Sequence, residues 1–179
     1  MPRFAANLSM LFTEMDFLDR FAAAAEAGFS GVEYLFPYDF PAEQIKAQLD
    51  ANKLTQVLFN LPAGDWAGGE RGIAILPERV EEFRAGVDKA IAYAKVLGNT
   101  QVNCLAGIVP RGVSDQKVHD TFVGNLVFAA ARLEEAGIRL LIEPINTIDI
   151  PGFYLTRTQQ ARSIINEVGS SNLFLQYDI

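Results

Sequence analysis

The sequence has few of the side chains on which several kinds of protein depend. One cysteine, Cys104, stands among 179 residues, which excludes an intramolecular disulfide and permits a reducing compartment. Cationic side chains are also scarce, since 15 Lys and Arg face 22 Asp and Glu, for a net charge of −7. This balance argues against nonspecific binding of nucleic acid or of an anionic membrane. We therefore expect a small-molecule substrate as the partner.

Long apolar runs are missing as well. No stretch reaches the length of a membrane span, and Met1–Asn7 lacks the apolar core of a signal peptide. Half of the residues are nevertheless hydrophobic, enough to bury one sizeable core. These features predict a single domain over residues 1–179, with no membrane segment and a cytoplasmic location.

Short β-rich runs alternate with stretches that have apolar residues at helical spacing, such as Val118, Phe122 and Leu126. Glycines follow four of the helical patterns, where a left-handed residue commonly ends a helix, and Ser114 is placed to cap another helix. The runs predict six strands, Phe4–Ser9, Val32–Phe36, Thr55–Asn60, Gln101–Ala106, Leu140–Glu143 and Leu173–Asp178. Five helices are predicted between them.

This rhythm suits either an open doubly wound sheet or a (β/α)₈ TIM barrel. The first strand–helix junction has no Gly-x-Gly-x-x-Gly, so we expect no nucleotide cofactor. The even repeat favours the barrel, and a complete barrel has about 250 residues. We therefore predict that this chain holds roughly the first six strands and five helices of a barrel. The two unpaired edges of such a sheet favour pairing with another chain, including a homo-oligomer.

Two carboxylates come at the ends of predicted strands. Glu143 ends an apolar run that Pro144 stops, and Asp178 ends the last run in the same way. Catalytic groups of α/β barrels lie at the carboxyl ends of strands. If the two strands are neighbours, the two negative charges require a cation or a shared proton between them. Asn7 and Asn103 also lie near strand ends, where an amide either orients a substrate or closes a turn.

The segment between Pro62 and Pro77 is long and rich in glycine, which is typical of a loop that closes on a small ligand. Arg71 is a candidate for gripping a substrate carboxylate through a bidentate hydrogen bond. The alternative is a solvated loop in which Arg71 pairs with Glu70 or Asp65. Trp66 either anchors this loop or touches the substrate.

Several stretches of the chain closely resemble hydroxypyruvate isomerases, which belong to the xylose-isomerase-like barrel superfamily. The resemblance is carried by Arg3–Phe12, Phe36–Asp39, Asn60–Trp66, Gly69–Gly72, Ile142–Asn146 and Leu175–Asp178. It implies an aldose–ketose type isomerase that interconverts hydroxypyruvate and tartronate semialdehyde in glyoxylate metabolism.

The resemblance also implies roles for single residues. Glu143 matches a catalytic glutamate, and Glu143 with Asp178 matches two ligands of a divalent metal. Ligation by oxygen alone favours Mg²⁺ or Mn²⁺. Arg71 and Asn103 are the predicted substrate-binding residues. The second catalytic glutamate of the family belongs to strands after the sixth, which leaves the activity of the 179-residue chain open.

Three hypotheses therefore stand side by side. The first is the hydroxypyruvate isomerase, and the second is a different metal-dependent barrel enzyme, acting on another short 2-oxo or 3-oxo hydroxy acid or on nucleic acid. The third is a non-catalytic, truncated barrel that pairs with another chain.

His119, the only histidine, falls inside a predicted helix, where we expect a surface residue. Cys104 has the surroundings of a small packed side chain.

Overall fold

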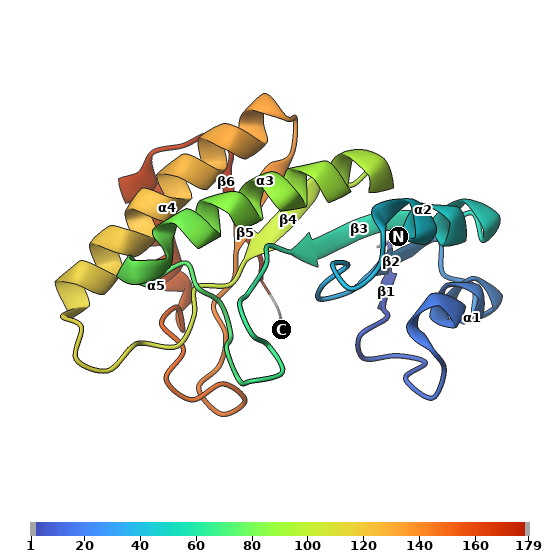
Figure 1. The fold of residues 1–179 in the computed structure, drawn as a ribbon, viewed down its shortest axis with the longest axis horizontal. Coiled ribbons are helices and arrows are strands. Elements are labelled where there is room, and N and C mark those ends of the chain that lie inside the picture. Colours follow the sequence, from blue (N-terminus) through green and yellow to red (C-terminus); the bar gives the residue numbers. More distant parts are fainter. Residues whose placement is uncertain (1–2, 178–179) are drawn as a thin grey trace.

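The computed structural model describes residues 3–177 as one sheet of six parallel strands with helices between them (Figure 1). The strands are β1 (Ala5–Asn7), β2 (Gly31–Glu33), β3 (Thr55–Asn60), β4 (Gln101–Cys104), β5 (Arg139–Ile142) and β6 (Leu173–Leu175). The helices are α1 (Arg20–Glu26), α2 (Ala42–Ala51), α3 (Val80–Leu97), α4 (Asp115–Glu135) and α5 (Thr158–Val168). Two 3₁₀ turns, η1 (Phe17–Asp19) and η2 (Pro77–Arg79), precede α1 and α3. The predicted alternation of six strands and five helices is confirmed.

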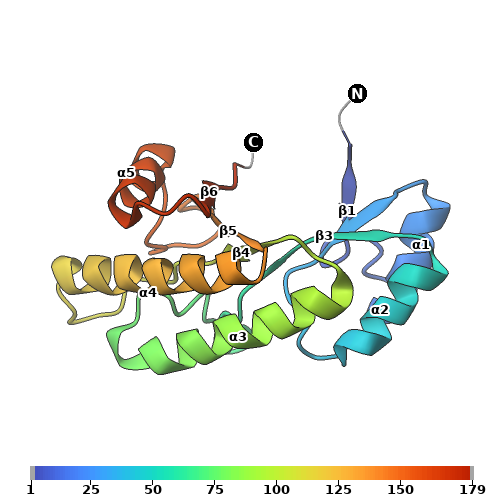
Figure 2. The same cartoon turned by 90° about the horizontal axis from the view of Figure 1, so that it is seen from above.

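The strands follow one another across the sheet in chain order, so each helix returns the chain to begin the next parallel strand. The helices form an outer layer in which each packs on the next, α1 on α2 through to α4 on α5 (Figure 2). Apolar residues at helical spacing, such as Phe122 and Leu126 of α4, are fully buried in the core that this layer shares with the sheet. Within residues 3–177, β1 and β6 form the two edges of the sheet. None of the helices in this range is long and apolar enough to cross a membrane.

The predicted caps explain where the helices begin and end. Ser114 Oγ accepts a hydrogen bond from the Lys117 amide at 3.3 Å, which satisfies one of the free N–H groups at the start of α4. Gly98 and Gly169 end α3 and α5 with φ angles of 72° and 67°, a left-handed conformation that costs glycine little.

Most strands are shorter than predicted at their carboxyl ends. β2 ends at Glu33 rather than Phe36, β4 at Cys104 rather than Ala106, and β1 at Asn7 rather than Ser9. Leu105 and Ala106 are buried although they lie beyond β4, because residues above the strand ends still pack inside the fold. Apolar composition therefore marks burial, and it does not mark where backbone pairing stops. β5 ends at Ile142, so Glu143 is the first residue after it, and β6 ends at Leu175.

The loops that follow β3, β4 and β5 are joined by backbone hydrogen bonds. The Ile75 amide donates to the Ala106 carbonyl at 3.2 Å, and the Tyr154 amide donates to the Gly107 carbonyl at 2.9 Å. Gly72 and Gly107 bring two of these loops into backbone contact, with φ angles of 121° and 119°. A Cβ on Gly72 would overlap the Leu105 carbonyl oxygen. The rim above the strand ends is therefore one connected layer of loops.

We expect Gly72→Ala to lower the free energy of unfolding by more than about 1 kcal/mol, because the added methyl meets backbone in a conformation that alanine rarely adopts. Urea denaturation measures this change. Gly124→Ala is the matched control, since a Cβ there meets nothing within 4 Å in the middle of α4. That substitution should raise stability by about 0.5–1 kcal/mol. Equal stability of the two variants would contradict the close approach of the loops.

Candidate functional site

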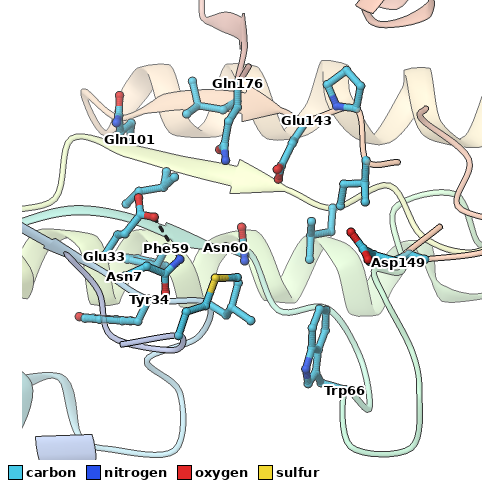
Figure 3. A pocket seen from close by; sticks show the side chains of 18 of the residues that line it. Asn7, Glu33, Tyr34, Phe59, Asn60, Trp66, Gln101, Glu143, Asp149 and Gln176 are labelled. Atoms are coloured by element: carbon cyan, nitrogen blue, oxygen red, sulfur yellow. Dashed lines mark hydrogen bonds between the residues drawn. The ribbon is translucent and has the colours of Figure 1, made fainter. Parts of the chain in front are cut away.

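A cavity of about 670 Å³ opens above the carboxyl ends of the strands (Figure 3). Its polar and aromatic lining includes Asn7, Glu33, Asn60, Trp66, Glu143, Asp149 and Gln176. These side chains come from strands and loops that are far apart in the sequence, and the parallel arrangement brings them to one rim. Glu143 and Gln176 enter the cavity from one side, and Trp66 stands on the other (Figure 3). Such a position is where α/β barrels bind their ligands.

The Glu143 carboxylate is held in place by a buried amide. Asn103 Nδ2 donates to Glu143 Oε2 at 3.1 Å and to Asn60 Oδ1 at 3.0 Å. Asn103 is fully buried, whereas the cavity is lined by its two partners. Asn60 and Asn103 are direct partners in the β3–β4 ladder, so the strand register itself places the two amides together. The charge of Glu143 is thus kept in one orientation at the rim.

Cys104 follows Asn103, and its side chain is buried in the core. Burial raises the pKa of the Cys104 thiol to about 12, because the thiolate would be poorly solvated there. The thiol stays protonated near neutral pH. As the sequence predicts, Cys104 is a small packed residue of the core.

A second carboxylate reaches the cavity from β2. Glu33 and Asn7 are partners in the β1–β2 ladder, and Asn7 Nδ2 donates to Glu33 Oε1 at 3.1 Å. Sequence reasoning missed Glu33 because the predicted strand Val32–Phe36 placed it inside the strand. With β2 ending at Glu33, it occupies a position like that of Glu143 after β5.

Gln176 and Asp149 complete the polar lining beside Glu143. The backbone N–H of Gln176 donates to the Ile142 carbonyl at 2.9 Å. This bond continues the β5–β6 ladder and brings Gln176 level with Glu143. Gln176 Oε1 is buried and has no hydrogen-bond partner among the described residues. Asp149, in the loop after β5, accepts a hydrogen bond from Asn146 Nδ2 at 2.7 Å. A buried oxygen without a partner at the cavity wall is suited to accept a hydrogen bond from a ligand or to bind a cation.

Arg71 and Asn103, the predicted substrate-binding residues, lie close to the cavity but not among the described residues that line it. Arg71 Nη1 donates to the carbonyls of Trp66 and Glu70, at 3.0 and 2.7 Å. The Arg71 guanidinium lies over the Trp66 ring at 4.2 Å from its centroid. Substrate binding by Arg71 and Asn103 stays a prediction. Asp178, the second predicted metal ligand, lies outside the described residues.

His119 of α4 is not among the described residues that line the cavity. Its ring nitrogens contact Tyr154 Oη at 3.0 Å and Glu167 Oε2 at 2.8 Å, which ties α4 to α5 and to the segment before it. His119 is partly buried rather than a free surface residue, because these two partners cover it. It contributes to packing between helices.

The charges that line the cavity are all of one sign. The described lining contains Glu33, Glu143 and Asp149 and no Lys, Arg or His. Across residues 3–177, no three His, Cys, Asp or Glu side chains are grouped closely enough to hold a metal ion by themselves. Like charges around one cavity are unfavourable unless a cation or a shared proton offsets them. The site therefore favours a ligand that brings positive charge or donates hydrogen bonds.

The sequence matches a known family over most of its length. The family model described as "Xylose isomerase-like TIM barrel" matches residues 21–179. The chain belongs to this family. The resemblance and the barrel fold class that the sequence predicts are thereby confirmed.

Comparison with named relatives shows which members of this family the chain is similar to. The chain is 59% identical to a hydroxypyruvate isomerase of Escherichia coli (strain K12) over 179 residues, which is all of this chain and 69% of that protein. It is 51% identical to a 2-oxo-tetronate isomerase of Cupriavidus necator, covering 99% of this chain and 68% of that protein. A crystal structure titled as AP endonuclease, family 2, from Brucella melitensis superposes with a TM-score of 0.97 at 46% identity, covering 100% of this chain and 69% of that one.

We expect Asn103→Ala to lower the free energy of unfolding by about 1–3 kcal/mol, because it removes the buried amide that donates to Asn60 Oδ1 and to Glu143 Oε2. Denaturation in urea measures the loss. Asn166→Ala, on the exposed face of α5, serves as control and should stay within about 0.5 kcal/mol of the parent. Two variants of equal stability would show that the Asn103 amide does not hold this rim.

Proposed function

We propose that the protein is an isomerase of short hydroxy-oxo acids, with hydroxypyruvate and tartronate semialdehyde as the interconverted pair. The observation that carries the proposal is the placement of Glu143, the predicted catalytic carboxylate. It stands at the carboxyl end of β5 in the cavity, oriented by Asn103. The relationship to a hydroxypyruvate isomerase at 59% identity supports this reading. A cytoplasmic role in glyoxylate metabolism belongs to the same proposal.

The chemistry moves a carbonyl group to the neighbouring carbon. Glu143 removes a proton from C3 of hydroxypyruvate, and the electron pair passes through an enediolate to C2. An acid then delivers a proton to C2. The C3 hydroxyl gives up its proton and becomes the aldehyde, and the C2 oxygen takes up a proton and becomes the hydroxyl. The hydrogen bond from Asn103 to Glu143 Oε2 fixes the orientation in which the carboxylate meets the substrate. The enediolate oxygen carries the developing negative charge and requires a positive or hydrogen-bonding partner.

A divalent cation suits this cavity. Hydroxypyruvate is an anion, and the described lining offers it three carboxylates and no basic side chain. Glu143 and Gln176 Oε1, which has no partner within residues 3–177, are hard oxygen donors in the same cavity, and Asp178 remains the second predicted ligand. Mg²⁺ or Mn²⁺ held by these residues would polarise the substrate carbonyl and offset the charge of the site.

A four-carbon substrate is the second candidate, and the 51% identity to a 2-oxo-tetronate isomerase favours it. The same proton transfer applies to any short 2-oxo acid with a hydroxyl on the neighbouring carbon. The ratio of kcat/KM for the two acids decides between them. A nuclease is not supported, because the acidic lining would repel a polyanion. Pairing with another copy stays a prediction.

We expect the purified protein to convert hydroxypyruvate to tartronate semialdehyde, with deuterium appearing at C2 when the reaction runs in D₂O and is followed by proton NMR. Glu143→Gln should lower kcat by about 10²- to 10⁴-fold, because the amide cannot accept the C3 proton. Glu26→Gln, an exposed residue of α1, makes the same chemical change away from the cavity and should leave kcat unchanged. A Glu143→Gln variant with full activity would remove Glu143 from the mechanism.

We also expect dialysis against EDTA to abolish activity and Mg²⁺ or Mn²⁺ to restore it. Binding of Mn²⁺, followed by its EPR signal, gives a readout that is independent of turnover. Glu143→Gln should weaken that binding, whereas Glu26→Gln should not. Full activity after EDTA treatment, with no Mn²⁺ bound, would show that the isomerisation needs no metal.

A further inference from the structure

Trp66 is the only tryptophan in the 179-residue sequence, and it forms part of the cavity wall. It belongs to the loop between β3 and η2, and Figure 3 shows it across the cavity from Glu143. The position is therefore one where a bound substrate would meet an aromatic surface on one side and the proposed base on the other.

The Trp66 ring is clamped from two directions. The Arg71 guanidinium lies over the ring at 4.2 Å, and Phe36 meets it edge-on with 5.0 Å between the ring centroids. Arg71 is itself fixed by its two hydrogen bonds to the backbone carbonyls of Trp66 and Glu70. A cation over an indole and an edge-to-face aromatic pair are both favourable, so the ring has a defined orientation.

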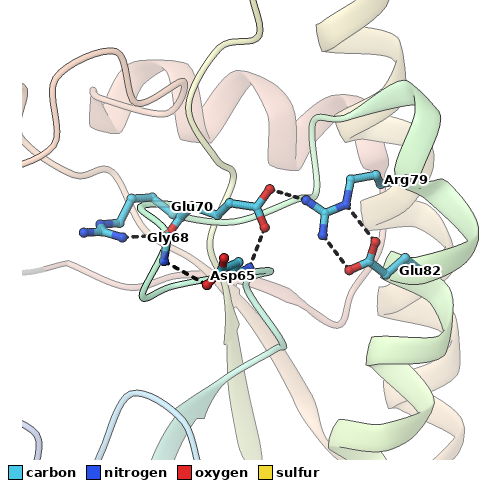
Figure 4. A network of polar contacts seen from close by, with 6 residues as sticks. Asp65, Gly68, Glu70, Arg79 and Glu82 are labelled. Atoms are coloured by element: carbon cyan, nitrogen blue, oxygen red, sulfur yellow. Dashed lines mark hydrogen bonds and ion pairs between the residues drawn. The ribbon is translucent and has the colours of Figure 1, made fainter.

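The backbone on either side of Trp66 is folded around the Glu70 carboxylate. Glu70 Oε2 accepts a hydrogen bond from the Asp65 amide, and Glu70 Oε1 forms an ion pair with Arg79 (Figure 4). Asp65 Oδ1 in turn accepts from the Gly68 amide at 2.8 Å. A Cβ on Gly64 would overlap Glu70 Oε2, so glycine at this position leaves room for the carboxylate.

Arg79 connects this loop to α3. Its guanidinium is held on the far side by Glu82, with nitrogen–oxygen distances of 2.6 and 2.7 Å (Figure 4). Hydrogen bonding to Arg79 lowers the pKa of Glu82, which favours the charged form of that carboxylate. Glu70 thus joins the turn that carries Trp66 to the start of a long helix whose inner face is buried.

We infer that Trp66 is a substrate-contacting residue that determines specificity, and that Glu70, held by Arg79, is a positioning residue that fixes the indole in the cavity wall. The flat ring would pack against the C–H side of a short, unbranched hydroxy-oxo acid and exclude wider chains. This inference rests on the proposed function for the identity of the substrate. The loop geometry that supports it does not depend on turnover.

Acrylamide quenching of Trp66 fluorescence tests the positioning. The difference between the parent protein and Trp66→Phe isolates the Trp66 signal. Glu70→Ala should raise the Stern–Volmer constant, because the loop no longer holds the ring, and Glu70→Gln should give an intermediate value since it keeps an acceptor for the Asp65 amide. Glu81→Ala, which breaks a similar ion pair with Arg84 on the exposed side of α3, should leave the constant unchanged. An unchanged constant in Glu70→Ala would overturn the role of Glu70.

Kinetics test the contact with substrate. Trp66→Ala should raise the KM for hydroxypyruvate by about 10-fold with a smaller change in kcat, and should improve the relative kcat/KM of branched analogues. Trp66→Phe, which keeps an aromatic ring, should have a KM close to that of the parent protein. Glu70→Ala should raise KM in the same direction as Trp66→Ala, and Glu81→Ala should not. An unchanged KM and unchanged selectivity in Trp66→Ala would overturn the specificity role.

Tartronate, an unreactive three-carbon hydroxy acid, separates the two proposals. It should change the Trp66 fluorescence of the parent protein in a saturable way, and Glu143→Gln should remain able to give this signal. If the parent protein shows the tartronate signal without turnover, the proposed isomerisation fails and the Trp66 contact stands. Turnover with no change in Trp66 fluorescence would instead overturn the contact.

Discussion

The hydrogen-bond register of the parallel sheet is the constraint on which the site depends. Because all six strands run in one direction, their carboxyl ends meet at one rim, and residues level in the ladders become neighbours in space. Asn7 faces Glu33, and Asn60 faces Asn103, each pair joined by a side-chain hydrogen bond. A slip of one residue would turn these side chains to the opposite face. The same backbone pairing that forms the core therefore also assembles the polar rim.

Acidic groups line the cavity, and amide side chains hold two of them, the half-buried Asn7 and the fully buried Asn103. Glu33, Glu143 and Asp149 carry negative charge, while the amides of Asn7 and Asn103 donate to the two glutamates. Donated hydrogen bonds stabilise the charged form of a carboxylate, and charge of one sign favours a ligand of the other. This arrangement is suited to proton transfer at a carbon next to a carbonyl, with positive charge supplied by what binds there.

The loops above the strands give this cavity a fixed wall. Backbone bonds join the loops after β3, β4 and β5, and the Glu70–Arg79 pair connects the first of them to α3. The sequence indicated a glycine-rich loop of the kind that closes on a ligand. Its glycines allow close packing, because Gly64 leaves space for the Glu70 carboxylate and Gly72 lies against backbone, and closure of the loop on a ligand stays a prediction. Arg71 was expected to pair with Glu70 or Asp65 if it did not bind substrate. It donates to the backbone carbonyl of Glu70, while the Glu70 carboxylate pairs with Arg79.

The sequence by itself determined the order of strands and helices, the caps at Ser114, Gly98 and Gly169, and the place of Glu143, because these depend on local propensity and on where an apolar run stops. Family membership was also readable from its motifs. The tertiary structure decided which distant residues meet. Glu33 became part of the site only when β2 ended one residue after Val32, and Trp66 became a wall only through contacts with Phe36 and Arg71. Such contacts depend on register and loop packing, which no local pattern encodes.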